Sequence, residues 1–277
     1  MFDKVLIANR GEIAVRINRA CQELGISTVA IHSEVDADSM HVRIADESVC
    51  IGPNPVNKSY LNSHAIISAC EITGAQAVHP GYGFLSENTS FAKMLDDHKL
   101  TFIGPKHKHI SMMGDKIEAK KIMQEYGVPT VPGSTEAIID LKDAINTSKE
   151  IGFPVLLKAS AGGGGRGMKV VHNEKELTET LPIIKQEALS FFGNDSIYIE
   201  KFIDSPRHIE IQVICDSHNN FLHLHERDCS IQRRNQKVIE EALAPEIDQA
   251  KKEKLFKICI DAMAQMGYLG LGTLEFL

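Results

Sequence analysis

The stretch at residues 153–168, FPVLLKASAGGGGRGM, constrains the fold more than any other part of the sequence. The apolar run at 155–157 predicts a strand that ends on Lys158, and the run at 169–171 predicts a second strand. The glycines at 162–165 lie between them, and their backbone N–H groups can turn towards an anion because no Cβ stands in the way. Lys158 adds a compact positive charge. The segment therefore predicts a hairpin that binds phosphate groups.

The alternative is a tight, mobile hairpin without a ligand. The positive charge of the loop, and its place between two strands rather than in a low-complexity tail, favour phosphate binding. No Lys-Ser or Lys-Thr pair follows the glycines, and no helix pattern follows them. The segment is therefore not a P-loop, which needs both features.

The composition is that of a globular chain with room for two domains, because 43% of its 277 residues are hydrophobic and 24% are charged. A net charge of −7 does not suggest a nucleic-acid partner. No apolar run reaches the roughly 18 residues of a membrane span. The six cysteines form no CxxC pair, and the sequence begins without a signal or transit peptide. We therefore expect a cytoplasmic protein, or a mitochondrial matrix protein if a transit peptide is absent from the sequence.

Strand and helix patterns alternate along residues 1–113, which predicts an α/β, Rossmann-like domain with a parallel sheet. The predicted strands are 4–8, 28–31, 77–79 and 101–103, and the predicted helices are 10–24, 61–73 and 87–97. The first turn, ANRGEIA, lacks GxGxxG, so dinucleotide binding is not expected. The loop HPGYGFLSEN follows a strand end, where open α/β sheets bind ligands, although an ordinary Pro-Gly connection is the alternative.

Residues 114–277 predict a second domain with a lid at about 131–203. A helix at 117–126 is expected to be capped by Asp115, with Lys116 in its first turn. Lysine there opposes the helix dipole, so Lys116 is either solvated or placed beside an anion. Helices are predicted at 141–151, 174–190 and 246–266, with a strand at 197–199. A glycine hairpin on a small hinged unit suits a lid over a nucleotide.

The strand pattern at 208–214 alternates, which places His208, Glu210 and Gln212 on one face. The charged segment that follows, ERDCSIQRRNQKVIEEA, predicts a site for anionic substrates. His223 and His225 could ligate a metal, but a plain surface pair is the favoured interpretation, and Cys229 is expected to be structural.

The sequence ends on GTLEFL, inside a predicted strand that carries Glu275. One carboxylate is too few to hold Mg²⁺ against a triphosphate. We therefore expect a truncated chain whose missing part supplies at least one more carboxylate.

These motifs together resemble the biotin carboxylase component of biotin-dependent acyl-CoA carboxylases, which is an ATP-grasp enzyme. The resemblance rests on KVLIANRGEIA, VHPGYGFLSEN, FIGP, MGDKIEAK, KASAGGGGRGM, IEKFI, PRHIEIQV, ERDCSIQRRNQKVIEEA and GTLEF. The runs RRNQK and FFGNDSIYIEKFIDSPRHIEIQV look most like the α subunit of propionyl-CoA carboxylase. The resemblance implies a pre-ATP-grasp domain at 1–113 and an incomplete ATP-grasp domain at 114–277.

The resemblance also implies roles for individual residues. Lys237 is the catalytic residue that binds bicarbonate, and Glu275 is a ligand of Mg²⁺ or Mn²⁺. Tyr82 and Gly83 border the biotin pocket. The residues implied to bind ATP are Lys116, Lys158, Gly164 and Gly165 at the phosphates, Glu200, Lys201, Phe202 and Ile203 at the adenine, and His208, Gln232 and Asn235 elsewhere on the nucleotide. Asn235 stands where most bacterial relatives have histidine, which leaves its own contact open.

The activity that the resemblance implies is ATP- and bicarbonate-dependent carboxylation of carrier-bound biotin through carboxyphosphate, which is the first half-reaction of an acyl-CoA carboxylase. The implied partners are a biotin carboxyl carrier domain and a carboxyltransferase (β) subunit, in a homodimer or a larger hetero-oligomer. Two alternatives stay open at this point. One is another ATP-grasp ligase of the carbamoyl-phosphate synthetase type, and the other is a nucleotide-binding fragment that is inactive on its own.

Overall fold

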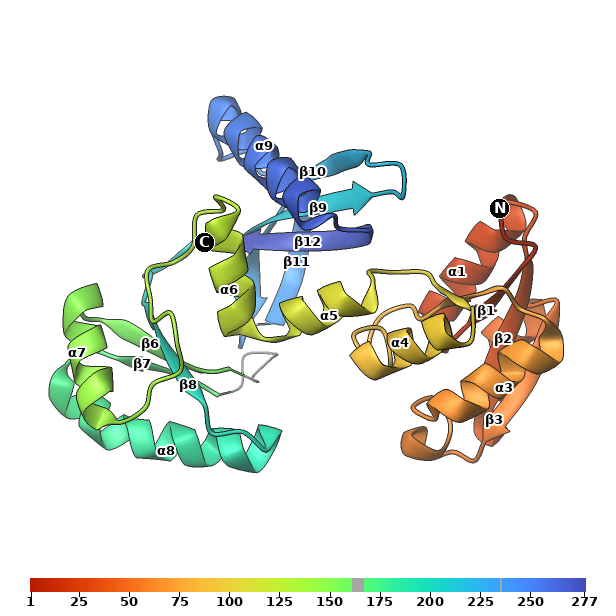
Figure 1. Cartoon of the computed structure of the whole chain (residues 1–277), viewed down its shortest axis with the longest axis horizontal. Helices are drawn as coiled ribbons and strands as arrows, with labels where there is room; N and C mark the ends of the chain where they lie inside the picture. Colours follow the sequence, from red (N-terminus) through yellow and green to blue (C-terminus); the bar gives the residue numbers. More distant parts are fainter. Residues whose placement is uncertain (161–166, 235) are drawn as a thin grey trace. The chain divides into compact units, whose positions relative to one another are not determined.

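The computed structural model of the chain describes residues 1–160, 167–234 and 236–277, and Lys116 by its backbone alone. The chain forms two compact units, Met1–Ser111 and Met112–Leu277. Figure 1 colours the first unit from red to yellow and the second from yellow to blue. The domain and lid limits expected from the sequence, 1–113, 114–277 and 131–203, stay predictions of where functional domains begin and end.

The first unit is built on a parallel sheet in the order β3-β2-β1-β4-β5, as the alternation of strand and helix patterns predicts. Its strands are β1 (Lys4–Ile7), β2 (Ser27–Ser33), β3 (Glu47–Gly52), β4 (Ala77–His79) and β5 (Thr101–Phe102). The sequence analysis missed β3. This strand lies at the edge of the sheet and exposes Glu47, Ser48 and Cys50, so it lacks the apolar run of a buried parallel strand.

Helices cover both faces of this sheet (Figure 1). Ile17 of α1 packs with Val5 and Ile7 of β1, whereas Leu6 of the same strand packs into the cluster that holds Ile66 of α3. Opposite faces of one strand therefore enter separate cores, as a Rossmann-like layer arrangement requires. The helical segments are α1 (Gly11–Glu23), a 3-10 turn (Glu34–Asp36), α2 (Met40–Ile44), a second 3-10 turn (Val56–Lys58), α3 (Ser63–Thr73) and α4 (Thr89–Asp97). Helix α5 (His107–Gly114) begins in this unit and ends in the second.

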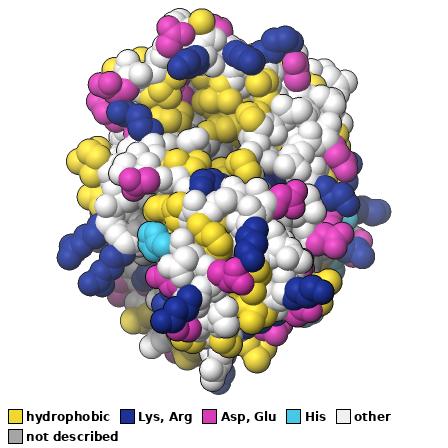
Figure 2. Space-filling view, turned by 90° about the vertical axis from the view of Figure 1, so that its left-hand side faces the viewer, with side chains coloured by type: hydrophobic (Ala, Val, Ile, Leu, Met, Phe, Trp, Pro, Cys, Tyr) yellow, Lys and Arg dark blue, Asp and Glu magenta, His cyan; other side chains and the backbone are white. Residues whose placement is uncertain are grey.

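The second unit contains an antiparallel sheet in the order β7-β6-β8, which includes the predicted glycine hairpin. Leu157 of β6 and Ile199 of β8 are fully buried against Leu177 of α8. The elements are α7 (Leu141–Ile151), β6 (Val155–Ala159), β7 (Met168–Val171), α8 (Glu174–Phe192) and β8 (Ile197–Lys201). The glycines at 162–165 lie outside the described residues, so the phosphate-binding loop stays a prediction. Figure 2 views the side of Figure 1 on which these elements lie, and it shows basic and acidic side chains interspersed around apolar patches.

The other sheet of the second unit is antiparallel, in the order β11-β10-β9-β12. Ile209, Ile211 and Val213 of β9 pack against α9, and side chains of α6 join the same cluster. The elements are α6 (Lys116–Glu125), β9 (Ile209–Cys215), β10 (Phe221–Arg233), β11 (Gln236–Ala242), α9 (Gln249–Met266) and β12 (Gly270–Phe276). Asp115 caps α6 as predicted, because its side chain accepts hydrogen bonds from the N–H groups of Ile117 and Glu118. Within the described residues, helices fall short of the length and apolarity that crossing a membrane requires.

A buried carboxylate holds the first turn of the first unit in place. Asp36 accepts hydrogen bonds from Arg10 Nε at 2.9 Å, from Tyr60 Oη at 2.7 Å and from Ser33 Oγ at 3.0 Å. These bonds, led by the one from Arg10, hold the pKa of Asp36 well below its usual range. Burial, together with Asp36, raises the pKa of Tyr60 to about 12.

We expect Asp36→Asn to lower the free energy of unfolding by about 2 kcal/mol at neutral pH, because a charged acceptor is lost. The pKa of Asp36 is depressed in the folded state, so its stabilising effect is present above the unfolded value of about 4 and is lost as the pH falls below it. Urea unfolding at about pH 7 and at about pH 3 should therefore give a smaller difference at the lower pH. Exposed Asp38, changed to asparagine, is the control and should have little effect. An equal loss for Asp36→Asn at both pH values would contradict the assignment.

Candidate functional site

Several residues singled out from the sequence come together in two clusters of the second unit, and both clusters contain a buried carboxylate. In the first, Glu200 of β8 lies between Lys120 of α6 and Lys158 of β6. Its Oε1 is 3.1 Å from Lys120 Nζ, and its Oε2 is 2.5 Å from Lys158 Nζ. Burial alone would raise the pKa of Glu200, but the charges of Lys158 and Lys120 outweigh burial and lower it. Glu200 is therefore an anion that two lysines share.

The residues after Glu200 are held by the backbone around the turn before β6. Lys201 Nζ donates hydrogen bonds to the carbonyl oxygens of Gly152 at 2.9 Å and Phe153 at 3.1 Å. The N–H group of Phe202 donates to Pro154 O at 3.2 Å, and Ile203 follows as a half-buried residue. The ammonium group of Lys201 thus ties β8 to the start of the hairpin. The adenine contacts expected of Lys201, Phe202 and Ile203 stay predictions.

The second cluster lies on the polar face of the β11-β10-β9-β12 sheet. Glu210 of β9, whose side chain is 2% exposed, pairs with Lys237 of β11 and accepts a hydrogen bond from Arg227 Nε at 2.6 Å. Lys237 Nζ also lies 2.8 Å from Glu275 Oε1 of β12. In the register of the sheet, Arg227 and Glu275 both stand directly opposite Glu210. Like charges placed opposite each other repel, so Lys237 stabilises the sheet by bridging the two carboxylates.

The charges of this cluster are fixed by their neighbours. Burial works against ionisation of Glu210, but hydrogen bonds from Lys237 and Arg227 prevail and lower its pKa. Burial also disfavours the ammonium form of Lys237, yet its bonds to Glu210 and Glu275 raise its pKa. Lys237 is therefore a held cation that can attract a small anion. Nearby Cys229 is fully buried, which raises its pKa to about 11, so it remains a protonated thiol, as expected of a structural cysteine.

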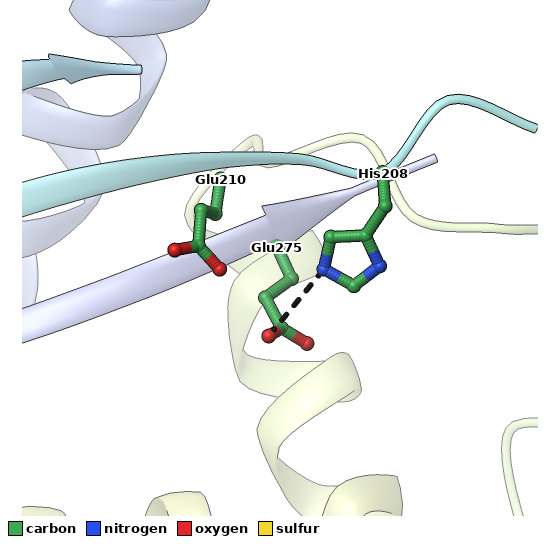
Figure 3. Close-up of side chains that lie close together, drawn as sticks. All are labelled: His208, Glu210 and Glu275. Atoms are coloured by element: carbon green, nitrogen blue, oxygen red, sulfur yellow. Dashed lines mark ion pairs between the residues drawn. The ribbon is translucent and has the colours of Figure 1, made fainter. Parts of the chain in front are cut away.

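His208, Glu210 and Glu275 lie close together, and Figure 3 shows their side chains on the same side of β9 and β12. Their possible ligand atoms lie within 4.8 Å of one another, and His208 Nε2 is 3.5 Å from Glu275 Oε1. Oxygen ligands suit Mg²⁺, but Glu210 already pairs with Arg227 and Lys237. Exposed Glu275 is therefore the carboxylate of this group that fits a metal ion best, and further oxygen ligands would have to complete the shell.

Some predicted site residues lie apart from these clusters or beyond the described residues. Gln232 donates a hydrogen bond from Nε2 to Cys229 O at 3.0 Å, within β10. Tyr82 and Gly83 belong to the first unit, where Tyr82 Oη bonds to Glu12 and Asn9 Nδ2 donates to Tyr82 O at 2.8 Å. Predicted contacts that fall outside the described residues are those of Gly164, Gly165, Asn235 and the Lys116 side chain.

His223 still pairs with Val213 of β9, but the regular strand alternation is broken between it and His225. The pairing of β10 with β9 shifts between His223 and Glu226, and His225 has a φ of 63°. The His223 ring stacks on Phe256 of α9 with centroids 4.0 Å apart, and the His225 ring lies edge-on to His223 at 5.2 Å. The two rings therefore pack on α9, and the surface-pair interpretation stays a prediction.

Sequence reasoning missed two residues that matter to these clusters. Lys120 gave no signal, because the run KIEAKK offers several lysines that a helical pattern does not distinguish. Glu210 was placed on the correct face of its strand, together with His208, but was not chosen as a site residue. Its signal was a carboxylate inside an otherwise apolar alternation, followed by a strongly basic segment.

Two protein families match the chain. Residues 1–110 match "Biotin carboxylase, N-terminal domain", and residues 115–277 match "Carbamoyl-phosphate synthase L chain, ATP binding domain". The biotin carboxylase of Pseudomonas aeruginosa is 54% identical over 278 residues, and the mitochondrial propionyl-CoA carboxylase alpha chain of Mus musculus is 53% identical over 276 residues. Both matches cover 100% of this chain, which spans 62% of the first relative and 38% of the second.

Solved structures agree with these relatives. The biotin carboxylase of Campylobacter jejuni in a beta-gamma-ATP complex has a TM-score of 0.96 at 48% identity. The biotin carboxylase domain dimer of Hydrogenobacter thermophilus 2-oxoglutarate carboxylase, with MgADP, ADP and bicarbonate, has a TM-score of 0.94 at 49% identity. Both matches cover 100% of this chain and 62% and 61% of the respective structures. The predicted resemblance and the predicted fold, a Rossmann-like unit followed by an ATP-grasp unit, are confirmed.

We expect Glu210→Ala to lower the free energy of unfolding by about 3 kcal/mol, because it leaves Arg227 and Lys237 without their buried counter-ion. Glu240→Ala is the matched control, since Glu240 is half exposed and 3.8 Å from Arg227 Nε. Its effect should stay below about 0.5 kcal/mol. Denaturant unfolding of both variants at neutral pH makes the comparison. Equal losses in the two variants would show that Glu210 is no more than a surface charge.

Proposed function

Since this chain belongs to the biotin carboxylase family, we propose that it carries most of the ATP- and bicarbonate-binding machinery of an enzyme that carboxylates biotin. The observation that carries this proposal is the position of Lys237, which is held between Glu210 and Glu275 on the polar face of one sheet. The residue assigned to bicarbonate thereby stands beside the residue assigned to the metal of the nucleotide. That proximity is what transfer of a phosphoryl group to bicarbonate needs.

The first cluster supplies the nucleotide side of the proposal. Lys158, with Lys116 and the amides of Gly164 and Gly165, would bind the phosphate oxygens. Glu200 to Ile203 would form the adenine pocket, and His208, Gln232 and Asn235 would contact the rest of the nucleotide. Support comes from the ion pairs that join α6, β6 and β8 at Glu200, because they bring a phosphate-binding lysine and an adenine-binding carboxylate together.

The second cluster supplies the anion side. Bicarbonate would bind at Lys237 through its negative charge, and one of its oxygens would attack the γ-phosphorus of ATP. The bond to the ADP oxygen breaks, and carboxyphosphate forms. The magnesium ion, held in part by Glu275, supplies neutralisation of phosphate charge when bound. Carboxyphosphate is a source of CO₂ for the ureido nitrogen of biotin. Tyr82 and Gly83 of the first unit keep the biotin-binding role that the resemblance assigns to them.

The partners proposed for the whole protein follow from the same family. They are a biotin carboxyl carrier domain and a carboxyltransferase subunit, and the chain itself would form a homodimer or a larger hetero-oligomer. The acyl-CoA would be propionyl-CoA or acetyl-CoA, and similarity to propionyl-CoA carboxylase alpha chains supports the former. Cytoplasm, or the mitochondrial matrix in a eukaryotic cell, would be the compartment.

A second candidate function is an ATP-grasp ligase of the carbamoyl-phosphate synthetase type. The match of residues 115–277 to the ATP-binding domain of the carbamoyl-phosphate synthase L chain favours it. Both reactions use ATP and bicarbonate, so the nucleophile that follows distinguishes them. The third candidate is a fragment that binds nucleotide without turning it over.

We expect ATP hydrolysis by the full-length protein, with bicarbonate present, to rise on addition of free biotin and to be unaffected by ammonium salts. With labelled bicarbonate, the carboxylated biotin that accumulates should release labelled CO₂ on acidification, because its carboxyl group comes from bicarbonate. Stimulation by ammonium with none by biotin would favour the second candidate. Nucleotide binding without turnover by the 277 residues alone, beside turnover by the full-length protein, would favour the third.

We expect Lys237→Gln and Lys158→Gln to separate the two anions. Lys237→Gln should raise the KM for bicarbonate by about 10-fold or more, because a charge-assisted contact is lost, and leave the Kd for ATP within about threefold. Lys158→Gln should raise the Kd for ATP by about 10-fold or more and leave the KM for bicarbonate within about threefold. Exposed Lys254→Gln is the charge-matched control and should change neither constant. Losses of equal size in both constants for Lys237→Gln would contradict its assignment.

A further inference from the structure

The cluster around Glu200 carries more positive charge than its carboxylate needs. Glu200 has a side-chain exposure of 11%, and the two lysines that contact it, Lys120 and Lys158, have exposures of 13% and 20%. Each lysine bonds a different carboxylate oxygen. Among the described residues, one negative charge thus faces two positive charges in a largely desolvated place. One of the two lysines can leave without stranding the carboxylate.

We propose that Lys120 is a positioning residue, which neutralises Glu200 so that Lys158 can release the carboxylate and bind a phosphate oxygen of the nucleotide. The inference rests on the proposed function and deepens it, because it assigns a task to a residue outside the predicted site. Lys120 touches Glu200 and is not required to touch the nucleotide.

The cost of leaving a carboxylate buried and unpaired gives the physical reason. With Lys120 in place, Glu200 keeps an ammonium partner at 3.1 Å when Lys158 turns away. Without Lys120, Lys158 would be the remaining described counter-ion of Glu200, and its departure would strand a buried charge. Breaking a buried ion pair in that way is strongly unfavourable. Lys158 would then remain on Glu200, and the phosphate would lose its cation.

Lys120 is the partner that remains with Glu200, because Lys158 is the lysine assigned to the phosphates. Gly133 packs against the pair so closely that a Cβ added there would lie 2.8 Å from Lys120 Nζ and 2.5 Å from Ile199 O. Lys120 also projects from α6, whose Ile122 and Met123 pack into the core beside β9. Lys158 stands near the end of β6, immediately before the predicted phosphate loop. Lys158 is therefore the lysine placed to exchange Glu200 for a phosphate oxygen.

The test measures how much the phosphates add to nucleotide affinity, which is the ratio of the Kd for adenosine to the Kd for ADP. Calorimetry of the full-length protein gives both constants. Lys120→Met should lower this ratio by about 10-fold or more, because Lys158 stays on Glu200. Lys121→Met is the matched control, since Lys121 is the exposed neighbour on the same helix, and it should leave the ratio unchanged. Circular dichroism checks that both variants fold.

A second variant separates positioning from a general structural role. In the double variant Lys120→Met, Glu200→Gln, the carboxylate that traps Lys158 is gone, so the ratio should return to within about threefold of the wild-type value. Changes in adenine binding at position 200 affect adenosine and ADP alike and cancel in the ratio. A ratio that is unchanged in Lys120→Met, or that is not restored in the double variant, overturns the inference alone. Failure of the wild-type protein to bind ADP overturns the proposed function as well.

Discussion

Buried carboxylates paired with basic side chains from neighbouring elements are the interaction on which the second unit depends. Glu200 joins α6, β6 and β8, and Glu210 joins β9, β10 and β11. Each carboxylate costs free energy to desolvate, and each recovers it only while its partners are held nearby. The fold therefore holds basic side chains beside both carboxylates, among them Lys158 and Lys237. The same two lysines are the groups that an anionic substrate would use.

Because these lysines serve both the fold and a substrate, the two clusters differ in their balance of positive and negative charge. Around Glu200 two lysines meet one carboxylate, which leaves a net positive site suited to a polyphosphate. Around Lys237 two carboxylates and Arg227 come together, which leaves the lysine charged but constrained. A strongly charged, mobile tail of ATP and a small, weakly charged anion need different degrees of attraction. The two balances match that difference.

Much of this arrangement follows from the sequence, because hydrophobic periodicity and capping residues are local signals. The alternation from His208 to Ile214 placed Glu210 on the polar face, and Asp115 was recognisable as a helix cap. Pairings between distant segments leave no such signal. Lys120 meets Glu200 from eighty residues away, as the sequence separation of their hydrogen bond shows. Strand β3 was not predicted, because an exposed edge strand lacks an apolar run. The loop at 162–165 lies outside the described residues, so its role rests on sequence alone.

The alignment of Arg227 and Glu275 across from Glu210 has a consequence for how the sheet assembles. A register shift of β9 by one residue would place Glu210 in the hydrophobic core under α9 and bring Ile209 or Ile211 to the polar face of the sheet. The same shift would break the ion pairs of Glu210 with Arg227 and Lys237. The charged pairs therefore favour this register of β9, β10 and β12 over a shifted one. A chain that has found its correct pairing has, by that act, also gathered Glu210, Lys237 and Glu275 on one face.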